Sequence, residues 1–151
     1  MIDYTERLDG LTADRLHGFF GHWARQPAPE DHLRLLKGSD HVVLAIDSES
    51  GMVVGNITAI TDGVSCAYIP HLEVLPSYQG QGIGSELVRR LLARLSYLYM
   101  VDLVCDRELQ PFYQRLGMRP ASAMIVRRYE HQVLNSGTEA RRSLARPTVR
   151  P

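Results

Sequence analysis

The sequence predicts a mixed α+β fold in which a mainly antiparallel central sheet carries helices on both faces. Two observations lead to this prediction. Residues 41–75 hold three β-rich runs joined by short turns, which is typical of an antiparallel meander. Amphipathic helical patterns stand before and after these runs. The resulting element order is β-α-α-β-β-β-α-β-α-β, and it favours one layered sheet rather than an all-α or all-β fold.

The first 40 residues are expected to form one short strand and two helices. The strand covers residues 2–4, and Thr12 is the expected N-cap of the first helix. Pro27 ends that helix, Pro29 suits the first turn of the second, and Gly38 is a natural C-cap. The apolar side chains at helical spacing in the first helix are Leu11, Leu16, Phe19, Phe20 and Trp23.

Seven further elements complete the predicted fold. Apolar side chains at i, i+1, i+4, i+5 and i+8 mark the longest helix, whose opposite side is charged. In chain order, the expected elements are strands over residues 41–46, 52–60 and 64–75, a helix that begins after Gly84 and runs to Leu95, a strand over 101–105, a helix over 106–117 and a last strand over 124–129.

Composition predicts one ordinary globular domain. The chain has 151 residues, of which 44% are hydrophobic and 23% charged, and its formal net charge is zero. This balance argues against a strongly basic nucleic-acid binder and against an acidic disordered protein. No apolar run approaches the roughly 18–20 residues of a membrane span, and the first residues lack the basic-then-apolar order of a signal peptide. We therefore expect a cytoplasmic protein with no membrane or nucleic-acid partner.

The domain is expected to cover residues 1–130, followed by a basic and flexible tail over 131–151. The tail contains four arginines, one glutamate and no apolar periodicity. The two cysteines, Cys66 and Cys105, form no CxxC motif and have no closely spaced histidine. Neither a disulfide framework nor a zinc site is expected from them.

A glycine-rich segment between the third long strand and the longest helix is the most informative part of the sequence. Gly80, Gly82 and Gly84 lie within five residues, where missing Cβ atoms let a ligand approach the backbone. Free N–H groups at a helix N-terminus bind phosphate. A P-loop is excluded because no Lys-Ser or Lys-Thr pair follows, and Lys37 is the only lysine.

A dinucleotide-binding loop of the Rossmann type is a weaker alternative. Its GxGxxG spacing would need glycine at position 85, where Ser85 stands, and the antiparallel meander upstream does not suit a βαβ unit. Asp102 does lie at a suitable distance for a ribose contact. A nucleotide-dependent oxidoreductase therefore stays open as a third hypothesis.

The arrangement Gln79-x-x-Gly82-x-Gly84 resembles motif A of the GNAT superfamily of N-acetyltransferases. The lead-in Leu72-Glu73-Val74-Leu75-Pro76 is similar to that family's strand before the motif, and the segment from Asp106 to Met118 resembles its second block. The resemblance spans about residues 40–130. Three positions of the second block depart from the family pattern, namely Asp106 for asparagine, Leu109 for alanine and Met118 for phenylalanine.

The resemblance implies a GNAT-like fold and acetyl-CoA as co-substrate, with no metal. It implies that the main chain at Leu72 and Val74 pairs with the pantetheine arm and that Gln79 caps or contacts the pyrophosphate. Asp106 would lie near the pantetheine arm or cap a helix. The main-chain N–H groups expected to hold the pyrophosphate belong to the loop residues Gly80, Gln81, Gly82, Ile83, Gly84 and Ser85.

Two side chains are the candidate catalytic residues. The attacking amine must be neutral, and strand alternation turns Glu73 away from Leu72 and Val74, so Glu73 is the candidate base, directly or through a water. His71 is the alternative base. Tyr113 is the candidate general acid for the leaving thiolate. Proton donation from a phenol to a thiolate is uphill by roughly 2 kcal/mol, so a hydrogen bond to the sulfur is the other role considered.

The expected reaction is acetyl transfer by direct attack of a primary amine, with a small molecule as the leading acceptor. A protein N-terminus or lysine is the alternative acceptor, and a non-catalytic acyl-CoA-binding domain is the alternative function. In relatives, the region that holds Phe19, Phe20, His22 and Trp23 roofs the acceptor pocket, although core packing is the plainer interpretation of these aromatic side chains. A homodimer through the last strand, 124–129, is a further expectation.

Overall fold

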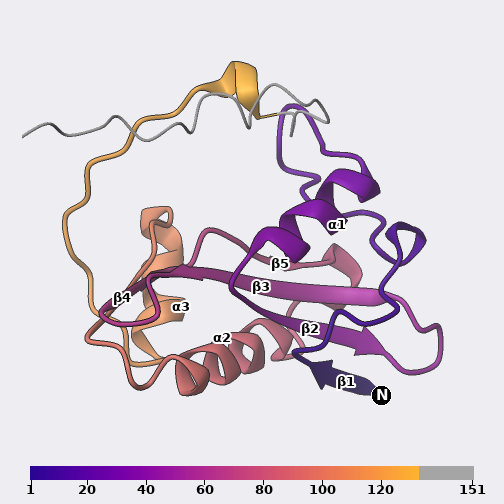
Figure 1. The fold of residues 1–151 in the computed structure, drawn as a ribbon, viewed down its shortest axis with the longest axis horizontal. Helices are drawn as coiled ribbons and strands as arrows, with labels where there is room; N and C mark the ends of the chain where they lie inside the picture. The colour runs from indigo at the N-terminus through magenta and orange to yellow at the C-terminus, as the bar shows by residue number, and fades with distance from the viewer. Residues whose placement is uncertain (133–151) are drawn as a thin grey trace, which may run out of the picture.

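The computed structural model describes residues 1–132, and it confirms the mixed α+β class with a mainly antiparallel sheet (Figure 1). The strand order is β1-β2-β3-β4-β6, and β5 pairs with the other end of β3. Every pairing is antiparallel except that of β4 with β6. The six strands are β1 (Ile2–Thr5), β2 (His41–Asp47), β3 (Val53–Thr61), β4 (Cys66–Tyr68), β5 (Leu72–Val74) and β6 (Met100–Asp102).

Helices cover both faces of this sheet, α1 (Pro29–Gly38) on one side and α2 (Ile83–Arg94) on the other (Figure 1). Two buried apolar clusters correspond to the two faces. Helix α2 packs closely because a Cβ at Gly55 of β3 would lie only 3.1 Å from Leu87 Cδ1. The short helix α3 (Gln110–Gln114) lies on the α2 side, and the 3-10 helices are η1 (Ala13–Arg15), η2 (Pro76–Tyr78), η3 (Arg107–Leu109) and η4 (Tyr129–His131).

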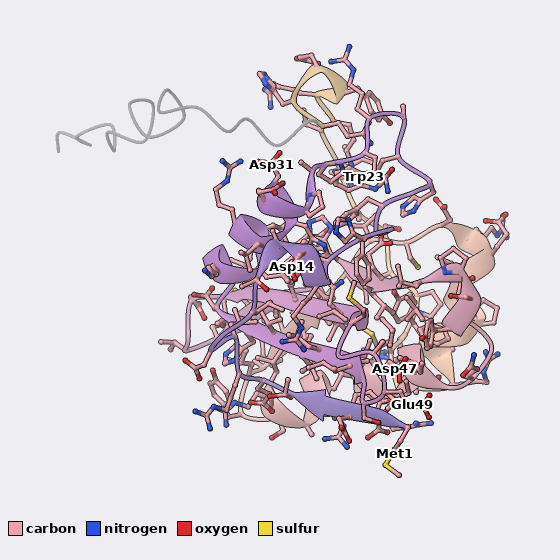
Figure 2. All side chains as sticks on the ribbon, turned by 90° about the vertical axis from the view of Figure 1, so that its right-hand side faces the viewer. Met1, Asp14, Trp23, Asp31, Asp47 and Glu49 are labelled. Carbon is pink, nitrogen blue, oxygen red and sulfur yellow. The ribbon has the colours of Figure 1, made fainter. Side chains whose placement is uncertain are left out.

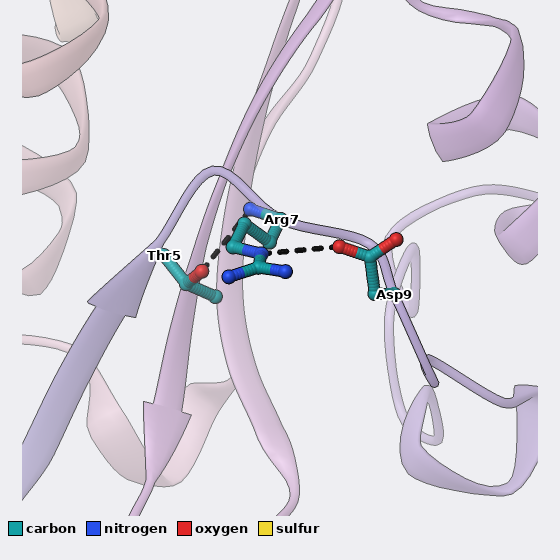
Figure 3. Close-up of polar contacts among 3 residues, drawn as sticks. All are labelled: Thr5, Arg7 and Asp9. Carbon is teal, nitrogen blue, oxygen red and sulfur yellow. Dashed lines mark hydrogen bonds and ion pairs between the residues drawn. The ribbon is translucent and has the colours of Figure 1, made fainter.

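The chain leaves β1 through an exposed polar turn (Figure 3). The N–H of Arg7 donates to Thr5 Oγ1 at 3.1 Å, and Arg7 Nε donates to Asp9 Oδ2 at 3.1 Å. Both charged side chains are about four-fifths exposed, so the ion pair contributes little to stability. The turn matters because it directs the chain across the sheet toward η1.

The first predicted helix is wrong. Apart from η1, residues 12–28 form turns, bends and irregular backbone, with no α-helix. Gly18 and Phe20 both have positive φ, +85° and +57°, which no right-handed helix accommodates. The apolar side chains were still placed correctly in the core, since Leu11, Leu16, Phe19 and Phe20 are all buried. Their spacing came from burial in successive turns rather than from one helical face.

Three other predicted elements are shorter than expected. The strand over 64–75 divides into β4 and β5 because Pro70 lies between them and has no N–H for the ladder. The strand over 101–105 ends at Asp102, and the helix over 106–117 becomes η3 and α3, with Pro111 in the first turn of α3. The predicted helix before Leu95 and the predicted helix over 29–38 are confirmed.

The predicted last strand, 124–129, is also wrong. Residues 119–128 have no strand assignment, and Met124, Ile125 and Val126 are largely exposed. Their β-branched and apolar character suits a strand, but a strand also needs a neighbour, and within the described chain none pairs with them. The tail predicted over 131–151 lies outside the described residues from 133 onward.

Candidate functional site

The glycine-rich loop of the predicted pyrophosphate site lies at the N-terminus of α2. Gly82 is the N-cap of α2 with φ of +83°, a left-handed conformation that suits glycine, and a Cβ there would meet nothing within 4 Å. The first backbone bond of the helix runs from Glu86 N–H to the Gly82 carbonyl. The N–H groups of Ile83, Gly84 and Ser85 therefore have no acceptor in the helix and can bind an anion.

Strand β5 presents an unpaired outer edge directly before this loop. Its inner edge pairs with β3, where Leu75 N–H donates to the Val54 carbonyl at 2.9 Å. Since hydrogen-bonded positions alternate along an antiparallel pair, the main-chain groups of Leu72 and Val74 face away from β3. Strand β6 pairs with β4 and leaves the sheet before it reaches β5. An extended ligand could therefore pair with Leu72 and with the N–H of Val74.

Two side chains hold the loop in place. The predicted loop residue Gln79 donates from Nε2 to the Val74 carbonyl at 2.9 Å, so its amide group lies against the end of β5. Tyr78 donates from its hydroxyl to Asp47 Oδ2 at 3.0 Å, which ties η2 to the β2–β3 turn. Asp47 is the last residue of β2, just before that turn, and lies near Met1 and far from Trp23 (Figure 2). Sequence reasoning did not identify the Tyr78–Asp47 bond.

Tyr113 lies on the α2 side of the sheet, where α3 packs against the larger core cluster. Burial, and secondarily the nearby Cys105, raise the pKa of Tyr113 to about 12. Burial and the charge of Asp106 raise the pKa of the Cys105 thiol as well. Asp106 is the N-cap of η3, but its side chain makes no capping hydrogen bond. Because its pKa is raised, the phenol of Tyr113 stays protonated at neutral pH and can donate a hydrogen bond.

Glu73 lies on the opposite face, beneath the segment between η1 and α1. Its side chain is 15% exposed, and its Oε1 lies 3.7 Å from His22 Nε2. Burial raises the pKa of this carboxyl, while His22 and a hydrogen bond from the Phe20 main chain lower it, with the net direction upward. A carboxylate with a raised pKa accepts protons more readily near neutral pH, as a base requires.

Four polar residues beside Glu73 were not identified from the sequence as a group. Asn56 is the register partner of Glu73, and Thr58 and His71 continue the same face of the sheet. Asn56, Thr58 and His32 of α1 are almost completely buried, at 0%, 0% and 1% exposure. None of their side-chain N or O atoms has a hydrogen-bond partner within the described protein. A buried polar atom that is left without a hydrogen bond lowers the free energy of unfolding by about 1–3 kcal/mol.

Burial lowers the pKa of both imidazoles, that of His32 to about 4 and that of His71 to about 4. Both rings are therefore uncharged at pH 7 and can donate as well as accept hydrogen bonds. Asn56 lies close enough to His32 to oppose this shift in pKa, yet their atoms do not meet in hydrogen-bond geometry. A signal for the group exists in the sequence, because two polar residues at i and i+2, Asn56 and Thr58, interrupt the apolar run over 53–60.

Cys66 and Cys105 are free thiols and half-buried. Among residues 1–132, no three or more His, Cys, Asp or Glu side chains are grouped so that they could hold a metal ion. No helix in this described part of the chain has the length and apolar character needed to cross a membrane.

Comparisons with known proteins agree with this geometry. The model of the family described as "Acetyltransferase (GNAT) family" matches residues 8–118. A Deinococcus radiodurans R1 protein assigned as an acetyltransferase is 45% identical, with a TM-score of 0.84 over 87% of this chain and 91% of its own. A GNAT-family acetyltransferase from Streptococcus pneumoniae TIGR4 is 30% identical, with a TM-score of 0.66 over 85% and 98%.

A more distant structure shows the shared fold alone. Glucosamine-6-phosphate N-acetyltransferase from Arabidopsis thaliana is 16% identical, with a TM-score of 0.65 over 85% of this chain and 98% of its own. A search of curated proteins found no match.

Proposed function

This chain belongs to the GNAT acetyltransferase family, and from that membership we propose that it transfers an acetyl group from acetyl-CoA to the primary amine of a small molecule. The family implies acyl-CoA-dependent acetyl transfer. The observation that carries the proposal is the unpaired edge of β5, which leads directly to the free N–H groups at the start of α2. The amide groups of a pantetheine arm would pair with the edge of β5, and a pyrophosphate would bind to the N–H groups at the start of α2.

The two candidate catalytic residues act from opposite faces of the sheet. Glu73 removes a proton from the acceptor ammonium, and the neutral nitrogen attacks the thioester carbonyl carbon. A carbon–nitrogen bond forms, the carbon–sulfur bond breaks, and the thiolate leaves on the side of Tyr113. The thioester would lie at the open edge of β5, between Glu73 and Tyr113. Glu73 could then reach the amine from one face of the sheet, and Tyr113 could reach the sulfur from the other.

The high pKa of Tyr113 favours hydrogen bonding over full proton transfer. A phenol with a pKa of about 12 gives its proton to a thiolate, whose conjugate thiol has a pKa of about 8.5, at a cost of roughly 5 kcal/mol. A hydrogen bond from the phenol to the departing sulfur stabilises the developing negative charge without that cost. The nitrogen, which is positively charged after the attack, loses its second proton to solvent, and the thiolate takes a proton from solvent, which leaves a neutral amide and coenzyme A.

The small-molecule acceptor is supported by a cavity of about 200 Å³ beside His32, which is lined by the segment before α1 and does not include Glu73 in its lining. Such a volume suits a small amine better than a peptide. A protein N-terminus or lysine remains the alternative acceptor, and a non-catalytic acyl-CoA-binding domain the alternative function. An assay of free thiol released from acetyl-CoA separates these possibilities: small amines, model peptides or nothing will stimulate release.

A matched pair of glycine variants tests the cofactor site. Gly82→Val places a branched side chain at φ +83° beside the free N–H groups, and we expect acetyl-CoA affinity measured by calorimetry to fall at least tenfold. Gly63→Val is the control, because Gly63 has φ +74°, equally open surroundings and a place in the β3–β4 turn. Equal loss in both variants, or retained affinity in Gly82→Val, would show that the loop does not bind acetyl-CoA.

We also propose a homodimer and a cytoplasmic location. The dimer is supported by exposed apolar side chains at the β4–β6 end of the sheet, which by strand alternation lie on the same face as Asn56 and Thr58. The patch consists of Ile60, Tyr68, Met100 and Val104. Sedimentation at micromolar concentration should give twice the chain mass of 17.0 kDa. The cytoplasmic location is supported by the two free thiols.

A further inference from the structure

The buried polar group on the α1 face of β3 and β5 has no hydrogen-bond partner among residues 1–132, which suggests that it binds a ligand. Five side-chain atoms of His32, Asn56 and Thr58 are inaccessible and make no hydrogen bond within residues 1–132. Valine at position 58 or leucine at position 56 would fill the same space and leave no buried polar atom without a hydrogen bond. Replacing these polar side chains by apolar ones would increase the free energy of unfolding. Because the protein keeps them despite this cost in stability, we interpret them as ligand-binding groups.

We propose that His32, Asn56, Thr58 and His71 recognise uncharged hydrogen-bonding groups, hydroxyl or carboxamide, next to the amine of the acceptor. This inference rests on the proposed function and narrows its substrate class. Asn56 pairs in register with Glu73, so a group that binds to Asn56 lies next to the carboxylate that would receive the amine's proton. The recognised groups are thus a few bonds from the reacting nitrogen.

The charges around the site favour an uncharged group over an anionic one. Neither the four recognition residues nor the residues that line the adjoining cavity include lysine or arginine. The charged carboxylate next to them, Glu73, would repel a phosphate or carboxylate on the acceptor. The two imidazoles are neutral at pH 7 and supply no counter-ion. An amine that carries hydroxyl groups or a carboxamide fits these donors and acceptors.

Access to the site requires displacement of an aromatic cover, defined as residues Phe19–Trp23. In the cover, the Phe20 ring lies 4.9 Å from His32 and 5.5 Å from His71, and the Trp23 ring lies 5.9 Å from His71. Figure 2 shows Trp23 on the irregular segment before α1. Phe20 has a φ of +57°, a left-handed conformation that costs free energy in a residue other than glycine. Its N–H and His22 both contact Glu73, so an arriving ammonium replaces two contacts of the cover.

Trp23 is the only tryptophan in the chain, so its fluorescence reports on the cover without any turnover. The probes are amines matched in size: 2-amino-1,3-propanediol against 3-aminopentane, and alaninamide against alanine. We expect the diol and the amide to change Trp23 emission saturably, with Kd at least tenfold lower than for the apolar and the anionic partner. The same order should hold for kcat/KM in the thiol-release assay.

Thr58→Val and Asn56→Leu test the recognising atoms. We expect kcat/KM for the diol to fall at least tenfold and that for 3-aminopentane less than threefold, with KM for acetyl-CoA unchanged. Thermal stability should stay equal or increase, because no internal hydrogen bond is lost. Thr58→Ser keeps the hydroxyl and should keep the preference for the diol. A purely structural role would instead lower stability and affect all amines alike.

Two outcomes overturn the inference in distinguishable ways. If all four amines are acetylated with similar kcat/KM, or Thr58→Val leaves the preference intact, the proposed function stands and the recognition site is refuted. If acetyl-CoA binds but no amine changes either thiol release or Trp23 emission, the proposed function fails together with it. A saturable emission change without turnover supports the recognition site and refutes acetyl transfer to these amines.

Discussion

Acidification from pH 7 to pH 5 should destabilise this fold through two buried imidazoles. The pKa of His32 and that of His71 are about 4 in the folded protein, against an ordinary value of 6.5. Between pH 6.5 and 4 the unfolded chain binds protons that the folded protein does not. The free energy of unfolding is therefore highest above pH 6.5 and decreases as pH falls toward 4.

The size of the effect follows from these two pKa values. For one imidazole, the free energy of unfolding falls by about 2 kcal/mol between pH 7 and pH 5. His32 and His71 together account for about 4 kcal/mol, a large share of the roughly 5–15 kcal/mol of a typical domain. Glu73 acts in the opposite direction, because its pKa is raised and its contribution to stability increases as pH falls. Variants are thus needed to separate the contribution of the two imidazoles to the pH dependence of stability from that of Glu73.

Urea unfolding at pH 7, 6 and 5 provides the assay. His32→Phe and His71→Phe each keep an aromatic ring and remove one titrating group, so each should lose about 2 kcal/mol of the parent's pH dependence. His17→Gln is the control, because His17 is an exposed histidine on the same side of the molecule. Phenylalanine variants that keep the parent's full pH dependence would refute the claim that burial holds these rings neutral.

Three further predictions concern the proposed active site. Tyr113→Phe should lower kcat roughly 10- to 100-fold, as expected for one hydrogen bond to a charged sulfur, and unchanged kcat would remove the residue from the mechanism. Glu73→Gln should abolish the rise of kcat/KM with pH that follows ionisation of its carboxyl, and an unaltered pH profile would move the base elsewhere. Tyr78→Phe removes the 3.0 Å bond to Asp47; we expect acetyl-CoA affinity by calorimetry to fall about fivefold, and unchanged affinity would contradict a role in loop placement.

The sequence was most informative where local chemistry decides structure. Helix α1 was predicted from Pro29 and Gly38 at its ends, and α2 from one long amphipathic stretch after the glycines. The first predicted helix failed because Gly18 and Phe20 adopt positive φ in order to bring aromatic rings over β5. Periodicity alone cannot distinguish a helical face from successive turns that bury the same residues.

Long-range pairing explains what was missed in the candidate site. Alternation along the strand was enough to turn Glu73 away from Leu72 and Val74, as the structure has it. The register of Asn56 with Glu73 depends on how two strands 17 positions apart align, and no local pattern specifies that. The division of one predicted strand at Pro70 likewise decides where β6 can pair and where the sheet opens.

Strand β3 contributes to both halves of the proposed site, because one of its faces packs against α2 and the other carries polar side chains. On the α2 side, Gly55 allows the helix that follows the pyrophosphate loop to approach the sheet, because a Cβ there would lie only 3.1 Å from Leu87 Cδ1 and 3.3 Å from Ile83 Cγ2. On the other side, Asn56 and Thr58 turn unpaired polar atoms toward the aromatic cover. In the proposed function, acetyl-CoA and acceptor would thus be positioned by the two faces of one strand, so neither site could shift along the sheet without the other. A rigid shared strand suits a reaction whose rate depends on how closely amine and thioester are held together.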